Sequence, residues 1–158
     1  MLKLGLESGS QKVLDQMNKG INLNRAARIL VNLRKAGIAA YIYLLFGTPY
    51  ETEKEARLTM DFVSRHHQSI TFLNLAIFNM PVCSSEAHDV LNRFSDGDLS
   101  LYCNFDHPDG WDRRSVRLFL QSHFRKSPRI NAIIQRDPPF FTSNHAPFFC
   151  MEQAGGSR

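Results

Sequence analysis

The sequence predicts an α/β fold in which parallel strands alternate with helices. Three short apolar runs, at 2–6, 39–46 and 71–78, are separated by segments whose apolar residues recur at three- and four-residue steps. The run at 39–46 is continuously apolar and aromatic, which is typical of a strand buried on both faces of a parallel sheet. Strands that alternate with helices imply right-handed crossovers and a parallel sheet, either open or part of a barrel.

The first strand is followed by two helices along this chain of 158 residues. The strand at 2–6 ends in a polar turn, and Ser10 is placed to cap a helix that stops at Gly20. A second helix begins at about Leu23 and stops at Gly37, with apolar residues along one side.

The second strand ends abruptly at Gly47-Thr48-Pro49. Thr52-Glu53-Lys54-Glu55 then has the pattern of a capping box, which predicts a helix that reaches about His66. The third strand, 71–78, ends at Asn79-Met80-Pro81, and a further helix is predicted from Ser84 or Ser85.

After about residue 95 the texture changes to turns and short helices. Residues 101–105 predict a short extended piece, Asp112 is placed to cap one helix, and Ser127-Pro128 begins another. Residues 138–150, rich in proline and phenylalanine, predict irregular chain. We therefore divide the chain into three β/α units, 1–95, and a mostly helical extension, 96–158.

Composition bounds the partners and the compartment. The net charge is +4, but the basic residues are dispersed and are not interleaved with aromatic residues, so nucleic acid is not expected as a partner. No window reaches the roughly 20 apolar residues of a membrane span, and the N-terminus lacks the pattern of a signal peptide. The sequence thus predicts a cytoplasmic protein without a membrane partner.

Cysteine and histidine spacing predicts no metal site within the chain. The three cysteines, Cys83, Cys103 and Cys150, are odd in number and far apart, which suits a reducing compartment. The adjacent pair His66-His67 falls on a predicted helix, where neighbouring side chains point apart.

The candidate binding residues follow the strands. Ligands of parallel α/β folds bind at the carboxyl ends of the strands. Here those ends are Glu7-Ser8-Gly9-Ser10, Gly47 to Thr52, and Asn79-Met80-Pro81. Their small and polar residues suit a backbone that approaches a ligand. From spacing alone, the alternative that Ser10 and Thr52 only cap helices, and the glycines only turn the chain, stays open.

These same segments resemble the radical S-adenosylmethionine (AdoMet) enzymes. Leu4-Gly5-Leu6-Glu7-Ser8-Gly9-Ser10 and the segment Val13 to Gly20 are similar to the family's fourth strand and following helix. Phe46-Gly47-Thr48-Pro49-Tyr50-Glu51-Thr52 is similar to its fifth strand and Gly-x-Pro-x-Glu-Thr turn, and 70–81 to its sixth strand. The resemblance covers residues 2 to about 82. It is nearest to the group that often carries a cobalamin-binding domain upstream, and it implies half of a (β/α)6 partial TIM barrel.

The resemblance also implies which residues contact the cofactor. Glu7 would face the ribose and methionyl part of AdoMet, with Ser8 beside it. Lys19 would pair with the methionyl carboxylate, although a lysine near a helix C-terminus also simply favours the helix dipole. Leu45 would contact the adenine, and Gly47 would let the chain approach the nucleoside. Glu51 would brace its own loop.

The family's Cys-x3-Cys-x2-Cys loop has no counterpart in this sequence. The resemblance therefore implies that the [4Fe–4S] cluster belongs to a missing N-terminal half of the same polypeptide, with cobalamin as a further cofactor of the parent enzyme. Met1 stands directly before the first strand, as in a fragment of a longer gene. We expect no catalytic residue and no activity in this chain alone, and the sequence does not specify the parent's substrate.

Two alternatives remain. The chain could be a non-catalytic interaction module whose edge strand at 2–6 pairs with a partner or with a second copy in a homodimer. It could also belong to an RNA-modifying relative, which would bind RNA in a salt-dependent way.

Overall fold

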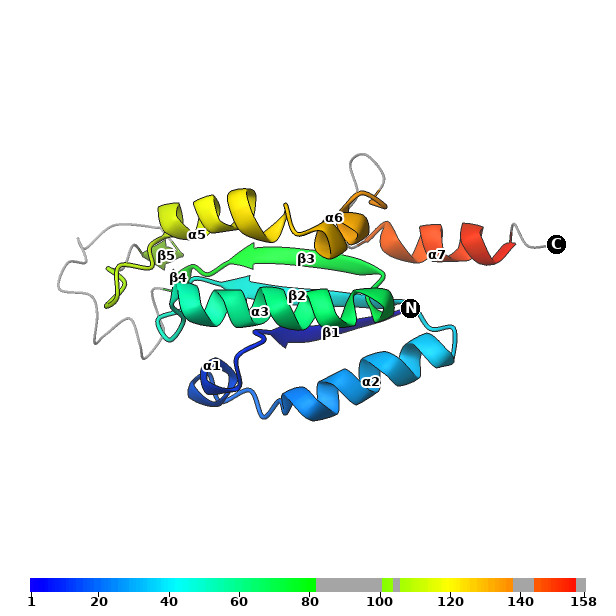
Figure 1. Ribbon diagram of the computed structural model, residues 1–158, viewed down its shortest axis with the longest axis horizontal. Helices are drawn as coiled ribbons and strands as arrows, with labels where there is room; N and C mark the ends of the chain where they lie inside the picture. The colour runs from blue at the N-terminus through cyan, green and yellow to red at the C-terminus, as the bar shows by residue number, and fades with distance from the viewer. Residues whose placement is uncertain (82–100, 104–105, 138–143, 156–158) are drawn as a thin grey trace.

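A parallel three-stranded sheet organises the chain. The computed structural model describes residues 1–81, 101–103, 106–137 and 144–155. The strands lie in the order β1–β2–β3 and both pairings are parallel, which confirms the predicted α/β class (Figure 1). Their bounds are Leu2–Glu7 for β1, Ala40–Phe46 for β2 and Phe72–Ile77 for β3.

Strand register divides the sheet into two faces. Leu4 pairs with Ile42 and Ile42 with Leu73, and these three side chains belong to the main core. Because side chains alternate along a strand, the neighbouring row points to the opposite side. That row is Lys3, Tyr41 and Phe72. We call this opposite side the second face of the sheet.

Helices cover the first face. In Figure 1, α3 lies across the sheet, α1 and α2 lie on the side of β1, and α5 and α6 lie on the side of β3. The helices are α1 Gln11–Gln16, α2 Leu23–Lys35, α3 Glu53–His66, α5 Arg113–Phe119, α6 Pro128–Ile134 and α7 Ala146–Gly155. A 3₁₀ turn, His67–Ser69, follows α3, and α5 continues into a π-helical segment, Leu120–Phe124. None of the described helices is long and apolar enough to cross a membrane.

One hydrophobic core contains residues from both predicted parts of the chain, 1–95 and 96–158. Phe46 of β2 packs against Phe124 with ring centroids 5.3 Å apart in an edge-on arrangement, and Phe119 lies 6.4 Å from the same ring. Phe46 and Phe124 are fully buried. Residues of 111–134 thus complete the core over the first face of the sheet.

The second face is partly covered by α7. Ala146 is fully buried against Tyr41 and Phe72, with Phe149 and Cys150 packed around them. The prediction of irregular chain at 138–150 is therefore wrong from Ala146 onward. The segment begins a helix because Pro147 is tolerated in a first turn and apolar residues beyond it have an aromatic surface to cover.

Two helix N-termini match their predicted caps and one does not. Thr52 and Glu55 form the expected capping box, and the Asp112 carboxylate accepts a hydrogen bond from the Ser115 amide. Ser10 stands at the N-terminus of α1, but its side chain makes no capping hydrogen bond. The helix it precedes is also shorter than predicted, because Asn18 already has a left-handed backbone (φ 53°) two residues before Gly20.

Other predictions concern segments that the structure describes only in part or not at all. The short extended piece at 101–105 contains β5, Tyr102–Cys103, which pairs antiparallel with β4, Met80–Pro81. The helix predicted from Ser84 or Ser85 lies outside the described residues. The division at residue 95 also stays a prediction.

Candidate functional site

The three strands end at one edge of the sheet. Because the pairing is parallel, Glu7, Phe46 and Ile77 close their strands on the same side, where the loops into α1 and α3 also lie (Figure 1). Glu7 pairs with Leu44, so the end of β1 lies beside the last residues of β2. The predicted loops therefore lie at a common edge of the sheet.

Glu7 has an unusual backbone conformation at this edge. Its φ is +64°, and the register of β1 shifts between Gly5 and Glu7. A Cβ added at Gly5 would lie 2.7 Å from Glu7 Oε1, so the carboxylate folds back over Gly5 on the second face of the sheet. A non-glycine residue in this region costs of order 1–3 kcal/mol, and such strain gathers at functional sites. The bulge places the Glu7 carboxylate in the space beside Gly5, which a side chain at position 5 would fill.

Ser8 and Gly9 attach the first loop to α3. Ser8 is fully buried, and its Oγ lies 3.2 Å from Oγ1 of Thr59. The same Thr59 oxygen accepts a 2.9 Å hydrogen bond from the Gly9 amide. A Cβ at Gly9 would come within 2.5 Å of the Thr59 backbone. The Ser8 hydroxyl is thus committed to internal contacts, which include a 3.1 Å bond from the Ser10 amide.

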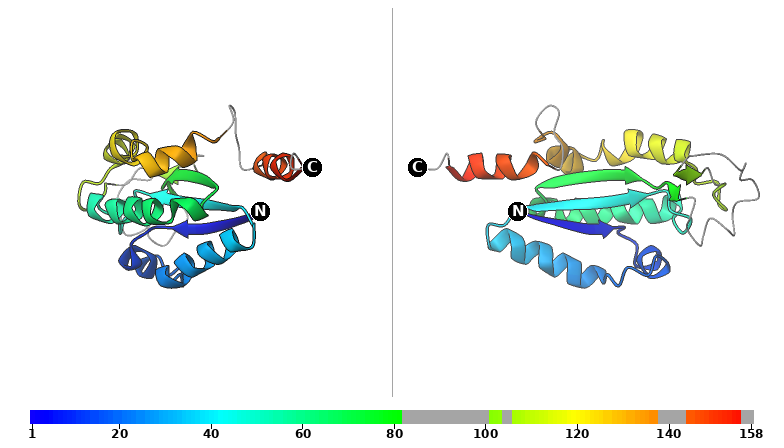
Figure 2. Two further views of the ribbon diagram at one scale, coloured as in Figure 1. Left: turned by 45° about the vertical axis from the view of Figure 1, so that its right-hand side comes forward. Right: turned by 180° about the vertical axis from the view of Figure 1, so that it is seen from behind.

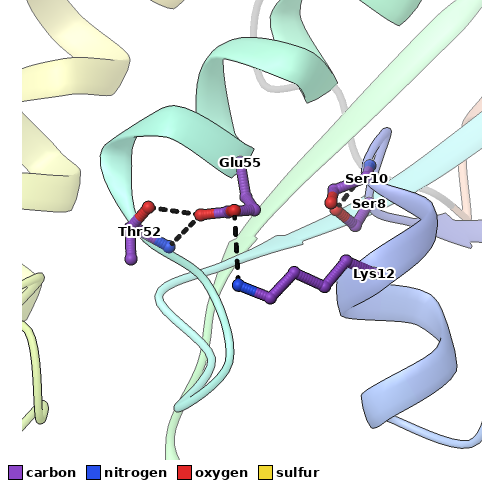
Figure 3. A network of polar contacts seen from close by, with 5 residues as sticks. All are labelled: Ser8, Ser10, Lys12, Thr52 and Glu55. Atoms are coloured by element: carbon purple, nitrogen blue, oxygen red, sulfur yellow. Dashed lines mark hydrogen bonds and ion pairs between the residues drawn. The ribbon is translucent and has the colours of Figure 1, made fainter.

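Figure 3 shows how the first turn of α1 reaches the N-terminus of α3. Lys12 Nζ lies 3.7 Å from Glu55 Oε1, while the other Glu55 oxygen accepts from the Thr52 amide and hydroxyl. Desolvation acts to raise the pKa of Glu55, but the Thr52 hydrogen bonds outweigh it and hold that pKa below its ordinary value. Glu55 therefore stays ionised and joins the two loops.

Leu45 and Tyr43 lie on the second face of β2. Their neighbours Leu44 and Phe46 belong to the main core, so the pleat directs Leu45 and Tyr43 away from it, and both are half-buried. Tyr43 pairs with Gly5 on one side and with Asn74 on the other. Figure 2 (right) shows the sheet from its second face, with α3 on the far side. Leu45 therefore shares the second face with the Glu7 carboxylate.

Lys19 is exposed in the turn after α1. Its amide bonds to the Leu14 carbonyl, and the residues on either side, Asn18 and Gly20, both have positive φ. No ion pair joins Lys19 to Glu7 in the part of the chain that the structure describes. The turn after α1 lies at the same end of the sheet as the end of β1 (Figure 1).

Gly47 begins the second loop with a φ of +77°. A Cβ there would lie 3.1 Å from Val116 Cγ2, so the close approach that the structure shows at Gly47 is to α5. Its amide donates a 2.5 Å hydrogen bond to Glu51 Oε2. Glu51 thus braces its own loop, as expected, while a contact of Gly47 with a nucleoside stays a prediction.

Glu51 is a fully buried carboxyl group. Its Oε2 also accepts a 3.1 Å hydrogen bond from Nε1 of Trp111, whereas Oε1 has no partner in the described part of the chain. Desolvation raises the pKa of Glu51 to about 7, against the lowering effect of the Gly47 and Trp111 hydrogen bonds. This carboxyl can therefore exchange a proton near neutral pH.

Sequence reasoning missed Trp111 and His107, which complete the second loop from about 60 residues downstream. His107 Nε2 lies 3.0 Å from the Thr48 carbonyl oxygen. A tryptophan and a histidine in a turn-rich segment carry no local signal that would assign them to this loop. Only the fold brings them there.

The residues present suit AdoMet better than they suit a metal cluster. A carboxylate and a half-buried leucine share the second face of the sheet, and a lysine is exposed at the same end. These can meet hydroxyls, an adenine and a carboxylate respectively. In contrast, no group of three His, Cys, Asp or Glu side chains converges anywhere in the described ranges. A [4Fe–4S] cluster has no ligand set among these residues.

Comparison with known proteins gives two partial similarities. The chain is 33% identical over 64 residues to an uncharacterized protein of Methanopyrus kandleri. It is 34% identical over 67 residues to bacteriochlorophyllide d C-12(1)-methyltransferase of Chlorobaculum tepidum. These regions make up 40% and 42% of this chain, and the chain covers 12% and 15% of the two relatives. No model of a protein family matches the sequence.

Proposed function

We propose that this chain is part of the AdoMet-binding core of a radical AdoMet oxidoreductase. The observation that carries the proposal is the arrangement at the carboxyl edge of the parallel sheet. There a bulge with positive φ folds the Glu7 carboxylate over Gly5, on the face that Leu45 shares. The similarity over 67 residues to a methyltransferase supports it, because AdoMet is a common methyl donor. In this proposal β1, β2 and β3 are the fourth to sixth strands of a (β/α)6 partial barrel.

Each candidate residue has a role that its surroundings allow. Glu7 accepts hydrogen bonds from the ribose hydroxyls, Leu45 packs against the adenine, and the Lys19 ammonium pairs with the methionyl carboxylate. Ser8 and Gly47 shape the loops beside the cofactor, since the Ser8 hydroxyl is bonded to Thr59 and the Gly47 amide to Glu51. In this proposal these residues bind and orient the cofactor, and none performs the chemistry.

The iron–sulfur half belongs to the remainder of the parent protein. A [4Fe–4S] cluster, when bound there, supplies the electron that cleaves the sulfonium of AdoMet. The cluster's cysteines would come from the N-terminal half of the same polypeptide, and cobalamin would bind upstream if the parent belongs to the cobalamin-associated group. The described residues of this chain hold and orient AdoMet but do not reduce it.

The test begins with the gene. Reading the frame upstream should reveal a Cys-x3-Cys-x2-Cys loop within about 150 residues, the usual size of one domain. The long protein, purified and reconstituted with iron and sulfide, should produce 5′-deoxyadenosine from AdoMet once it is reduced. A reduced, cluster-loaded long protein that releases no 5′-deoxyadenosine contradicts the proposal.

Two lysines make a matched pair of variants for binding. Lys19 follows α1 at the carboxyl edge of the sheet, whereas Lys35 ends α2 at the opposite edge, and both are exposed (Figure 1). In the reconstituted long protein, Lys19→Ala should weaken AdoMet binding about tenfold, as the loss of a charged hydrogen bond of about 1.5 kcal/mol implies. Lys35→Ala should leave the dissociation constant unchanged in the same equilibrium dialysis.

A second candidate function rests on β1, which is an outer strand of the sheet. β1 pairs only with β2 among the described strands, and Leu2 on that edge is 46% exposed. An unpaired edge is a template for another strand, so the chain could be an interaction module that dimerises or binds a partner there. Analytical ultracentrifugation would show concentration-dependent association, and Lys3→Pro, which removes an edge amide, should abolish it. A monomer at all concentrations contradicts self-association.

A further inference from the structure

The loop between β2 and α3 is tied to a distant segment by buried polar contacts. Trp111 Nε1 donates to Glu51 Oε2 over 3.1 Å, and His107 Nε2 lies 3.0 Å from the carbonyl oxygen of Thr48. Both side chains are nearly inaccessible, with exposed fractions of 6% for Trp111 and 7% for His107. We call His107 and Trp111, with their contacts to Thr48 and Glu51, the buried tether.

The histidine of the tether is fixed in one tautomer. Its Nδ1 accepts hydrogen bonds from the backbone amides of Asp109 and Trp111, at 3.1 and 3.3 Å. A nitrogen that accepts cannot carry the proton, so the proton resides on Nε2, which donates to the Thr48 carbonyl. His107 therefore orders its own turn and holds the loop at the same time.

The loop depends on this tether because its own side chains offer few alternatives. Thr48 Oγ1 and Glu51 Oε1 are buried without a hydrogen-bond partner in the described part of the chain. Thr48 is held instead through its carbonyl, and Glu51 through its second oxygen alone. Gly47, which begins the loop, donates its amide N–H to that same Glu51 oxygen and directly follows the Leu45-Phe46 end of β2.

We propose that His107 and Trp111 are positioning residues that hold residues 47–52, and through Gly47 the end of β2, in the shape required to bind AdoMet. The tether itself rests only on the contacts above, whereas its role toward the cofactor rests on the proposed function. The segment that follows residue 105 is then part of the binding apparatus. A flexible loop would have to be ordered when the ligand binds, and a tethered loop avoids that cost.

The first test measures hydrogen exchange of the Gly47 amide by NMR in the chain as it stands. Trp111→Phe keeps an aromatic ring beside Phe119, 5.7 Å away in the structure, and removes the indole N–H. We expect the Gly47 amide to exchange about tenfold faster while the amides inside β2 keep their relative protection. The control is Ile130→Val, in the same core but without polar contact to the loop. It should not accelerate exchange of the Gly47 amide more than that of the amides inside β2.

A rescue experiment separates positioning from simple packing. His107→Ala should accelerate exchange of the loop amides, and His107→Gln, whose amide N–H can still donate to the Thr48 carbonyl, should restore most of the protection. Unchanged Gly47 exchange in Trp111→Phe, or equal acceleration throughout the sheet in both Trp111→Phe and Ile130→Val, would overturn the tether. The same result for His107→Gln and His107→Ala would remove His107 from it.

AdoMet binding by the reconstituted long protein then tests the role toward the cofactor. Trp111→Phe should raise the AdoMet dissociation constant about tenfold, and Ile130→Val should not change it. If the parent binds AdoMet equally well with Trp111→Phe, the positioning role is wrong although the proposed function stands. If the parent itself binds no AdoMet, the proposed function and the cofactor role both fail, while the exchange result still decides whether the tether holds the loop.

Discussion

Glu51 is a buried carboxyl group whose pKa is raised by desolvation to about 7. It lies near the end of the loop 47–52, fully buried, with two N–H donors on one oxygen and none on the other within the described chain. Glu55, four residues on, remains ionised and adds a like charge nearby. The free energy of unfolding therefore depends on whether the buried Glu51 carboxyl group is protonated.

Stability should fall as the pH rises from about 5 to 8. The folded-state pKa of Glu51 is raised from 4.5 to about 7, so over this interval the unfolded chain loses the proton first. Ionisation then favours the unfolded chain until the folded protein also titrates near pH 7. The raised pKa corresponds to a loss of about 2–3 kcal/mol in the free energy of unfolding. Urea unfolding at several pH values measures it.

Glu51→Gln is the variant that isolates this effect. Glutamine keeps an oxygen for Gly47 and Trp111 but does not titrate. Between pH 5 and 8, the free energy of unfolding of the variant should therefore change by about 2–3 kcal/mol less than that of the unsubstituted protein. Groups such as His66, whose pKa is lowered by burial and by Arg65, titrate in both proteins and cancel in the difference. Parallel pH profiles for the two proteins would show that Glu51 does not titrate in this range.

At the scale of elements, the N-termini of α1 and α3 illustrate two ways to begin a helix. α3 begins with a capping box in which Thr52 and Glu55 satisfy each other's backbone amides. α1 begins at Ser10, whose hydroxyl makes no such bond, and is instead fixed by Ser8, Gly9 and Thr59 of α3. The longer helix carries its own start signal in its sequence, whereas the six-residue helix depends on a neighbour.

Thr52→Ala should therefore destabilise the chain more than Ser10→Ala does. Loss of an N-cap hydroxyl costs about 1 kcal/mol, and here it also removes the hydrogen bond that the hydroxyl donates to Glu55, while the bond from the Thr52 amide remains. Ser10→Ala removes no capping bond, so it should lower the free energy of unfolding by less than Thr52→Ala does. Denaturant titrations followed by circular dichroism compare the two. Equal losses would mean that the capping box adds nothing here.

At the scale of the whole molecule, one core holds the sheet and the segment 111–134 together. Phe46 of the central strand contacts rings at 119 and 124, and Trp111 packs edge-on against Phe119. Arg57 of α3 lies 5.8 Å from the centre of the Phe119 ring. Because both segments contribute to the same buried cluster, we expect them to unfold together.

Phe124→Ala tests that shared core. Phe124 is fully buried, and replacing such a ring with alanine costs about 3–5 kcal/mol. Trp111 fluorescence, which reports on the C-terminal segment, and far-ultraviolet circular dichroism should show one coincident transition shifted to lower urea. Phe148→Ala is the control, since Phe148 is 64% exposed and its loss should be nearly neutral. Separate transitions for the two signals would show two independently stable parts.

The sequence alone determined the parallel α/β class and most element positions. Local information was sufficient where it was strong: the continuous apolar run at 39–46, the Thr52–Glu55 capping box, and Pro128 at the start of α6. It failed at Ser10 and at 146–150, because a serine before a helix does not reveal whether its hydroxyl finds an amide. An apolar stretch likewise does not reveal which surface it covers.

Only the tertiary structure decided what the candidate residues contact. Sequence placed Glu7, Leu45 and Gly47 at strand ends, but the bulge that folds Glu7 over Gly5 and the approach of Val116 to Gly47 depend on pairing and packing. The contacts of His107 and Trp111 with the second loop join residues about 60 positions apart. Local periodicity reports on neighbours along the chain, whereas such contacts form only when the core brings distant segments together.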